Sequence, residues 1–406
     1  MKKFKKSVKL KMNNKNNTLK YFQSFIKYLL LALIIFSYTN TYSSTKDDSL
    51  KISILTCDPG KELYSSFGHT AIRLIDYSQN LDIVFNYGTF DFDSPNFYGK
   101  FIKGKLNYQL SISTLDSFKR SYLSENRTIY EQTLNMSQEG KSRIFNFLKT
   151  NYLPENRYYL YDFFLKNCTS VVRDILKDHP EYENCFYDTE ISSQLSFREH
   201  LHSLMKEKRW TGFVLDILLG YPSDKITTKF ESMFLPHVLM NELENIYCKE
   251  EKITGEITVI FQAQEESSFN NKFLGPVPVF WFLFILILII SVFDLRKGNK
   301  SFIVDKIIFS IAGLMGILFI FLWLGTDHWT LSKNMNLIWA IPLHLPVILM
   351  LRKLNKRFIK YYFLITAVIA GLLLFAWNLI PQNFPPAVIP ISLIIFIRSA
   401  RIYFKR

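Results

Sequence analysis

Cysteine and metal-ligand patterns are sparse in this sequence of 406 residues. It has four cysteines, no CxxC pair and no HxxxH pair, so no spacing typical of a zinc site occurs. It also has no internal repeat and no long low-complexity segment after its Lys/Asn-rich start, which argues against a repeat architecture. We therefore expect a protein that works without a metal and without a cofactor.

Acidic residues are missing where the basic residues gather. Residues 1–27 hold nine lysines and no acid, and residues 296–406 hold fourteen Lys/Arg and two acids. Since these two tails carry +9 and +12 of a net charge of +14, the middle of the chain carries about −7. The basic charge therefore flanks hydrophobic segments and forms no stripe on the folded domain, so we expect no nucleic-acid partner.

The first hydrophobic run, residues 28–38, is short for a membrane span, which needs roughly 20 apolar residues. It follows a basic region and leads into a stretch of small polar residues, as in a signal peptide. An uncleaved anchor is the alternative. In both cases residues 1–44 precede an exported part that begins at residue 45.

The composition becomes strongly apolar after about residue 275. Lys and Arg gather in alternate loops, and this positive-inside pattern puts the C-terminus in the cytoplasm and the soluble part outside. We thus predict a multi-pass inner-membrane protein with an exported domain, 45–270, in the periplasm, and an all-α membrane domain, 271–406. The last two spans could also form one broken hairpin around the prolines at 381–386. The predicted spans are near 276–293, 306–324, 336–351, 361–380 and 386–400.

The exported part reads as α+β. Alternating apolar residues predict strands, and Ser137 is a candidate N-cap for a helix over 137–153. A second helix is expected over 169–177, and the later part is mostly helical. All four cysteines lie here and could pair in an oxidising compartment; Cys185 with Cys248 is one option among several. The strands are expected near 50–59, 69–76, 81–90, 107–113 and 128–136.

One histidine and one cysteine stand at the starts of such elements. His69 follows a glycine and heads a strand, while Cys168 lies at the first turn of a helix. A helix N-terminus favours the thiolate, and a nearby imidazole can take the thiol proton. The imidazole needs a polar group to orient it, and Asn86 on the neighbouring strand is the best-placed candidate. Together these residues predict a cysteine nucleophile with a histidine base.

Several stretches carry a family resemblance. "FGHTAIRL", "FNYGTF" and "YDFFLKNCTSVVRDIL" resemble a circularly permuted papain-like domain, in which the histidine strand precedes the cysteine helix. With "ENRTIYEQTL", "GYPSDK", "MFLP" and "TDHWTLSKNMNLIWAIPLHL", they resemble the bacterial (Bacteroides-type) lipoprotein N-acyltransferase family. That family joins a periplasmic domain to several C-terminal spans, and the resemblance covers roughly residues 50–350.

The resemblance implies a membrane acyltransferase. Cys168 would take a fatty acyl chain from a phospholipid donor as a thioester, and the N-terminal amine of a diacylglyceryl-cysteine lipoprotein would accept it. His69 would move the protons, and an oxyanion hole would come from the Cys168 amide with Tyr161 or Tyr159. Substrate positioning is further expected of Asn167 and Arg73. The alternatives are a thiol hydrolase of cell-wall peptides or lipid esters, and an inactive papain-like module that binds lipid or a partner.

Polar residues also gather around the third predicted span. One hypothesis assigns them to a lipid headgroup site or to the completion of the active site, because polar groups in spans are costly and usually functional. The alternative is an interfacial structural cluster anchored by tryptophans. These candidate lipid-binding residues are Asp327, His328, Asn334, Asn336 and His344.

Overall fold

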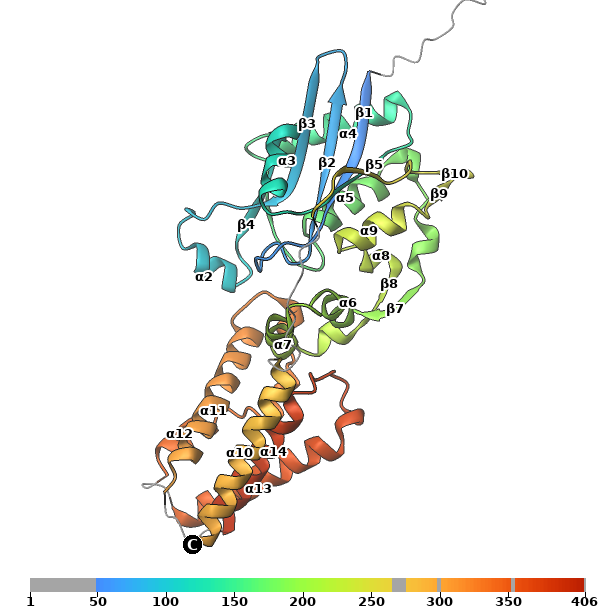
Figure 1. Cartoon of the computed structure of the whole chain (residues 1–406). Helices are drawn as coiled ribbons and strands as arrows, with labels where there is room; N and C mark the ends of the chain where they lie inside the picture. The colour runs from blue at the N-terminus through green and yellow to red at the C-terminus, as the bar shows by residue number, and fades with distance from the viewer. Residues whose placement is uncertain (1–48, 265–274, 298–300, 352–354, 405–406) are drawn as a thin grey trace, which may run out of the picture. The chain divides into compact units, whose positions relative to one another are not determined.

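The computed structural model describes residues 49–264, 275–297, 301–351 and 355–404 (Figure 1). The chain divides into two compact units, Met1–Asp48 and Ser49–Arg406, and every described residue lies in the second. The predicted signal peptide or anchor lies outside the described residues. It stays a prediction, as do the predicted domain boundaries. We call residues 49–264 the sheet domain and residues 275–404 the helical region.

The sheet domain is built on one antiparallel sheet of seven strands in the order β11-β5-β1-β2-β3-β4-β6. The predicted strand–turn–strand unit is confirmed: β2 pairs with β3, with Ile72 opposite Phe85. The ladder between β3 and β4 is irregular between Asn86 and Thr89. The strands are β1 Leu50–Cys57, β2 His69–Asp76, β3 Leu81–Thr89, β4 Asn107–Thr114, β5 Ile129–Thr133, β6 Tyr158–Leu160 and β11 Thr258–Phe261.

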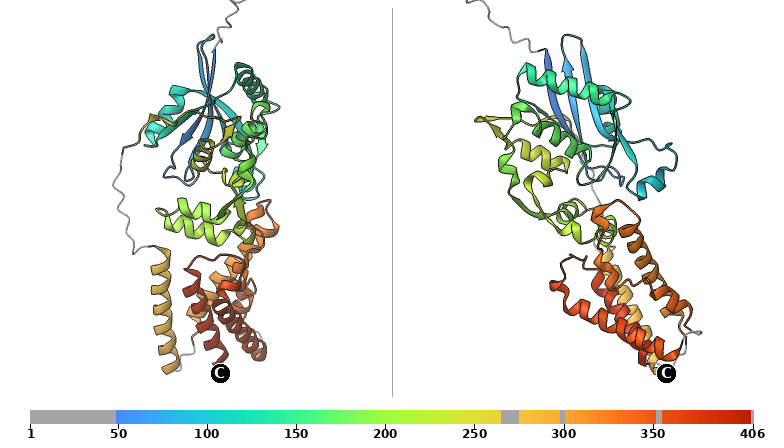
Figure 2. Two further views of the ribbon diagram at one scale, coloured as in Figure 1. Left: turned by 90° about the vertical axis from the view of Figure 1, so that its right-hand side faces the viewer. Right: turned by 180° about the vertical axis from the view of Figure 1, so that it is seen from behind.

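Successive side chains of β2 point to opposite faces of the sheet, and both faces are buried there. Ile72 lies in the larger core cluster, which includes Val172 of helix α5 (Cys168–Lys177). Its neighbour Ala71 lies in a second cluster on the other face, which includes Phe118 of helix α3. Figure 2 shows helices on both sides of the sheet. A strand held from two sides is a rigid support for the residue at its start.

Local capping explains where the helices begin. The predicted N-cap Ser137 is confirmed, since its Oγ accepts a hydrogen bond of 3.0 Å from the Gly140 amide at the start of α4. Two helices, α2 and α3, were not predicted. The helices of this part are α2 Phe97–Ile102, α3 Leu115–Ser124 and α4 Gln138–Tyr152.

The rest of the sheet domain is mostly helical, as predicted. Two small two-stranded sheets interrupt it, β7 with β8 and β9 with β10. The elements are β7 Ser192–Ser196, α6 Phe197–Leu204, α7 Arg209–Leu218, β8 Ile226–Thr228, α8 Lys229–Ser232, α9 Pro236–Leu243, β9 Tyr247–Cys248 and β10 Glu251–Lys252. Short 3-10 helices of the chain lie at Pro180–Tyr182, Tyr187–Glu190, Tyr221–Asp224, Trp329–Leu331, Met335–Ile338 and Trp377–Leu379.

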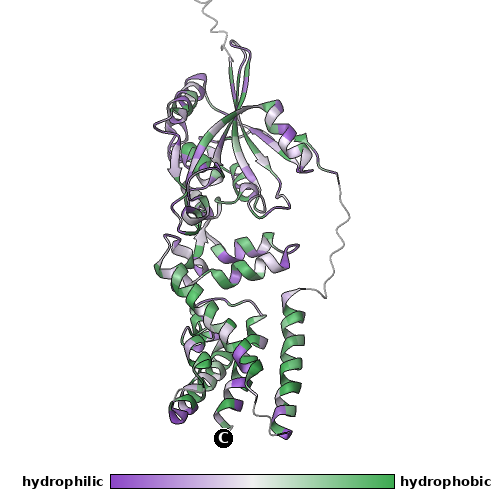
Figure 3. Cartoon of the chain, turned by 90° about the vertical axis from the view of Figure 1, so that its left-hand side faces the viewer, coloured by the Kyte–Doolittle hydropathy of each residue, from purple (hydrophilic) through white to green (hydrophobic). Residues whose placement is uncertain are grey.

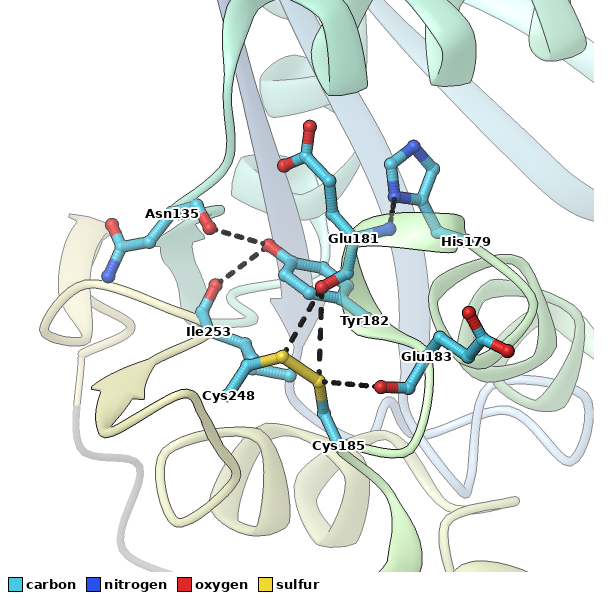
Figure 4. The surroundings of a disulfide bond; sticks show 8 residues. All are labelled: Asn135, His179, Glu181, Tyr182, Glu183, Cys185, Cys248 and Ile253. Carbon is cyan, nitrogen blue, oxygen red and sulfur yellow. Dashed lines mark hydrogen bonds between the residues drawn. A yellow bond between two sulfur atoms is a disulfide. The ribbon is translucent and has the colours of Figure 1, made fainter.

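A disulfide closes the end of this part (Figure 4). Cys185 and Cys248, 63 residues apart, are bonded, which resolves the pairing that the sequence left open. Beside it the Tyr182 hydroxyl donates toward the carbonyl oxygens of Asn135 (3.0 Å) and Ile253 (3.2 Å). The bond and this hydroxyl tie the segment after α5 to the segment before β11. Cys57 and Cys168 are free thiols.

The helical region contains three helices long and apolar enough to span a membrane, among the residues that the structure describes: α10, α11 and α13 (Figure 3). The predicted third span, 336–351, is not one helix. Pro342 disfavours helical geometry in the residue before it, and only the six residues of α12 are α-helical there. The helices are α10 Pro276–Arg296, α11 Ile303–Leu324, α12 His344–Leu349, α13 Lys356–Phe375 and α14 Val388–Phe404.

Four charged residues of α10, α11 and α14 form one buried ion-pair network. Arg398 pairs with Asp305 (2.6 Å) and Asp294 (3.2 Å), and Arg401 pairs with the same two carboxylates at 2.6 and 3.1 Å. The side chains of Arg398 and Asp305 are fully buried. Two arginines facing two aspartates leave the network formally neutral, which makes such burial tolerable.

The end of α7 is hydrogen-bonded to the helical region, and we call these contacts the α7 seam. The amide nitrogens of Asn334 and Asn336 donate to the Ile217 carbonyl oxygen at 2.8 and 3.0 Å. Gln382 donates to the Leu219 carbonyl oxygen at 3.3 Å. These bonds satisfy carbonyl groups that a helix leaves unpaired at its C-terminal end.

Candidate active site

Cys168 stands at a tightly capped helix N-terminus. The Oδ1 atom of Asn167 accepts hydrogen bonds of 2.8 Å from the amides of Thr169 and Ser170, and the Ser170 hydroxyl accepts one from the Asn167 amide. The Asn167 side-chain nitrogen donates to the carbonyl oxygens of Phe163 and Phe234 at 2.8 Å each. Asn167 is therefore buried, and its side chain fixes the first turn of α5. Its predicted role in substrate positioning stays a prediction.

β2 brings His69 to that helix start. Next to the pair, the hydroxyls of Thr70 and Thr169 lie 3.1 Å apart in a buried contact between β2 and α5. Burial raises the pKa of the Cys168 thiol, but the charge of His69 and a hydrogen bond with its imidazole lower it more, together with hydrogen bonds from the Thr70 amide and the Thr169 hydroxyl. The resulting pKa is about 7, so Cys168 ionises at lower pH than an ordinary thiol does.

A glycine lets a third element approach the sulfur. Gly88, near the end of β3, has a φ of +82°, a conformation that favours glycine. A Cβ atom there would lie 3.2 Å from the Cβ of Cys168. The backbone of the "NYG" stretch in β3 therefore packs directly against Cys168.

Tyrosine side chains surround the sulfur. Burial raises the pKa of Tyr159 and Tyr161 strongly, and the charge of Cys168 raises both further. Both phenols therefore stay protonated and can donate a hydrogen bond near the thiolate. Tyr108 stacks on Tyr161 with ring centroids 4.1 Å apart. The structure thus brings both predicted oxyanion candidates to Cys168, while their role stays a prediction.

Tyr122 of α3 was missed by the sequence analysis. Its ring stacks on the His69 imidazole, with centroids 6.4 Å apart and planes 20° apart. Cys57, which faces His69 across the β1–β2 ladder, interacts with the Tyr122 hydroxyl. Burial raises the pKa of Cys57 far above the usual thiol range, so this second thiol stays protonated. An amphipathic spacing of Leu115, Phe118 and Tyr122 could have predicted the helix.

The side chain of Asn86, the predicted partner of His69, forms its hydrogen bonds with other residues. The Asn86 amide donates to the Ser113 hydroxyl (3.3 Å) and the Val84 carbonyl oxygen (3.4 Å), and no hydrogen bond among the described residues joins it to His69. Its role in orienting His69 stays a prediction.

Arg73 is engaged by carboxylates. It forms a two-pronged contact with Asp82 at 2.9 and 2.7 Å and pairs with Glu131 at 3.0 Å. The guanidinium therefore links β2 to its neighbour β3 and, across β1, to β5. Its predicted role in substrate positioning is not tested by this geometry.

The five candidate lipid-binding residues lie in three places. Asp327 and His328 are in the loop after α11, where they contact α2 and the residues after it. Asn334 and Asn336 are buried in the α7 seam. His344 is buried, and its Nδ1 lies 2.7 Å from the Tyr362 hydroxyl. The structure does not bring these five residues into one site with Cys168, and lipid binding by them stays a prediction.

Two family models match the chain. Residues 37–189 match the Lnb N-terminal periplasmic domain, and residues 268–406 match the Lnb transmembrane domain, described as five transmembrane helices. The chain belongs to the Lnb family. It is therefore a membrane protein with a periplasmic domain, of the lipoprotein N-acylation family. Neither a curated protein nor a solved structure matches it.

The Lnb assignment confirms the predicted family and the combination of an α+β domain with a helical membrane region. His69 and Cys168 both lie within the Lnb periplasmic match. The papain-like relationship stays a prediction, as does cysteine dependence. Among the described residues, no group of three or more His, Cys, Asp or Glu side chains is placed to hold a metal ion.

Thiol labelling tests the electrostatics of the Lnb-type site. In the full-length protein in detergent, iodoacetamide should alkylate Cys168 with a half-maximal rate near pH 7 and should leave Cys57 unmodified. In His69→Ala, the main cause that lowers the pKa is gone while burial still raises it. Labelling of Cys168 should then require higher pH. Peptide mass spectrometry across a pH series measures this, and a wild-type rate that rises only above about pH 9 would contradict the site.

Proposed function

We propose that this Lnb-family protein is a cysteine-dependent acyltransferase. It moves a fatty acyl chain from a phospholipid, through a thioester on Cys168, to the N-terminal amine of a diacylglyceryl-cysteine lipoprotein. The observation that carries the proposal is a half-buried thiol at the start of α5 whose pKa is held at about 7 by His69. Thiolates react with esters, and a histidine partner supplies the proton that the leaving group needs.

In the first half-reaction, the Cys168 thiolate attacks the ester carbonyl carbon of the phospholipid. The tetrahedral oxyanion would be met by the Cys168 amide at the start of α5 and by the hydroxyls of Tyr159 and Tyr161. The C–O bond then breaks. The leaving lysophospholipid oxygen takes the proton that His69 holds, and the acyl chain remains on sulfur.

In the second half-reaction, the amine of the lipoprotein attacks the thioester carbonyl carbon. His69 accepts a proton from the amine, the C–S bond breaks, and the thiolate and imidazolium pair is restored. Tyr122, stacked on the imidazole, would hold the ring in place through both steps. Both substrates are lipids, which agrees with a chain that joins this site to a membrane region.

Mass spectrometry of lipoprotein N-termini tests the proposal. Lipoproteins from cells with the gene should carry an acyl chain on the N-terminal amine, and lipoproteins from a deletion strain should keep that amine free. Purified protein should release one lysophospholipid for each amide formed. Release of lysophospholipid and free fatty acid without an amide product would instead identify a thiol hydrolase.

A further inference from the structure

The segment between β3 and β4 exposes an unusual amount of apolar surface. Residues 90–106 contain the short helix α2, which stands out at the β4 end of the sheet (Figure 1). Its exposed side chains include Tyr98 (73 % exposed), Phe101 (50 %) and Ile102 (47 %), and Phe92 nearby is 62 % exposed. Exposed apolar groups that cluster in this way indicate a surface that meets lipid or a partner.

The contacts of this segment place it at the periplasmic end of a membrane-spanning helix. The Asp327 amide donates to the Lys103 carbonyl oxygen (2.9 Å), and the His328 Nε2 lies 3.1 Å from the Phe101 carbonyl oxygen. Asp327 and His328 follow α11, a candidate span, by only a few residues. Since the segment belongs to the Lnb periplasmic domain, its exposed apolar side chains stand at the level of the membrane surface.

A basic pocket opens beside these side chains. Its volume is about 440 Å³, and its lining residues include Lys100, Lys105, Asn107 and Gln109. Asp91 is the one acidic residue among the lining residues. Lys105 also lies 3.8 Å from the Asp327 carboxylate, but both side chains are exposed, and a surface pair of this kind is weak. The two lysines and the two amide side chains therefore suit an anionic, oxygen-rich group such as a phosphodiester.

We propose that this pocket binds the phosphodiester of a glycerophospholipid in the periplasmic leaflet, with its acyl chains running along Tyr98, Phe101 and Ile102. The inference rests on the proposed function in one respect, because this lipid would be the acyl donor. The same segment reaches the candidate active site: Phe97 of α2 packs in one cluster with Tyr108, which stacks on Tyr161 beside Cys168. A headgroup held here would therefore bring a donor lipid to the edge of the reaction centre.

Equilibrium binding of dihexanoyl phosphatidylglycerol to the full-length protein in detergent tests the pocket without requiring transfer. Lys100→Gln/Lys105→Gln should weaken binding at least tenfold. Lys103→Gln is the control: it removes one lysine charge from the same exposed segment without touching the pocket lining, and it should change binding less than twofold. The single variants Lys100→Gln and Lys105→Gln, which match it in charge, should each weaken binding more than Lys103→Gln does. Cys168→Ala should bind as the wild type does.

Two results would overturn the proposal. The first is unchanged lipid binding in the double lysine variant, or an equal loss in Lys103→Gln, because general surface charge would then explain the affinity. The second is glycerol 3-phosphate binding as tightly as the lipid, because the site would then hold a free phosphate compound. If wild-type protein binds the lipid in this pocket but forms no amide product, the proposed function fails while the lipid site stands.

Discussion

Cys168→Ala is expected to lower the rate of acyl transfer by roughly three orders of magnitude or more, since removal of a covalent nucleophile leaves only binding and oxyanion stabilisation. The protein should remain in the membrane, because Asn167 caps α5 through its own side chain and not through the thiol. Transfer by purified variants into a synthetic diacylated lipopeptide measures the loss. A Cys168→Ala variant that fully complements a deletion strain would end the thioester mechanism.

His69→Ala should cause a comparable loss at neutral pH but with a different pH profile. Without His69, burial raises the pKa of Cys168, so thioester formation should recover partly as pH rises, whereas Cys168→Ala should not recover at any pH. His202→Ala is the matched control. This imidazole is exposed and pairs with Asp216, and the variant should keep activity within about tenfold.

The second large effect is expected in the ion-pair network of the helical region. Asp305→Leu leaves Arg398 and Arg401 sharing one carboxylate, Asp294. Breaking a buried pair by removing one partner costs about 3–5 kcal/mol, because a buried charge stays uncompensated. We expect a large fall in the thermal midpoint of the detergent-solubilised protein and a lower level in the membrane.

A double variant separates charge balance from packing. Asp305→Leu/Arg398→Leu restores neutrality, because Arg401 and Asp294 still pair at 3.1 Å, and it should be more stable than Asp305→Leu alone. Glu139→Ala is the surface control. It removes an exposed pair with Arg143 and should leave the thermal midpoint almost unchanged, because surface ion pairs contribute little to stability. If the double variant is as unstable as the single one, packing rather than charge explains the effect.

Local pattern was enough to predict the supports of the candidate site. The alternation of apolar and polar residues after His69 predicted β2, and the polar residues before Val171 predicted the start of α5. Both signals are local, because a helix cap and the periodicity of a strand or helix depend on residues close in the sequence. The proximity of His69 and Cys168 could be inferred only because a thiol and an imidazole can act together in catalysis. That proximity depends on β2 and α5 packing together, which no local spacing encodes.

Long-range contacts account for what the sequence did not predict. Tyr122 reaches His69 because α3 packs on the face of the sheet opposite to α5, and the sequence analysis had no helix there. The polarity of Asn334 and Asn336 beside a span predicts either lipid ligands or a structural cluster, and lipid binding stays a prediction. In the structure their amides bind the end of α7, a partner more than a hundred residues earlier in the chain. A polar residue near a membrane is equally consistent with either partner until the fold is known.

The α7 seam also has a consequence for the order in which the protein can mature. The Asn334 that holds the Ile217 carbonyl is made 117 residues after it. At about 5–20 residues per second, the ribosome needs roughly 6–23 s to reach Asn334. During this time the Ile217 carbonyl oxygen has no hydrogen bond from Asn334. The exported domain therefore gains the hydrogen bonds of the α7 seam only after Asn334 has been synthesised, which follows α10 and α11 in the chain. Secretion of the domain alone would give a protein in which the end of α7 lacks these bonds.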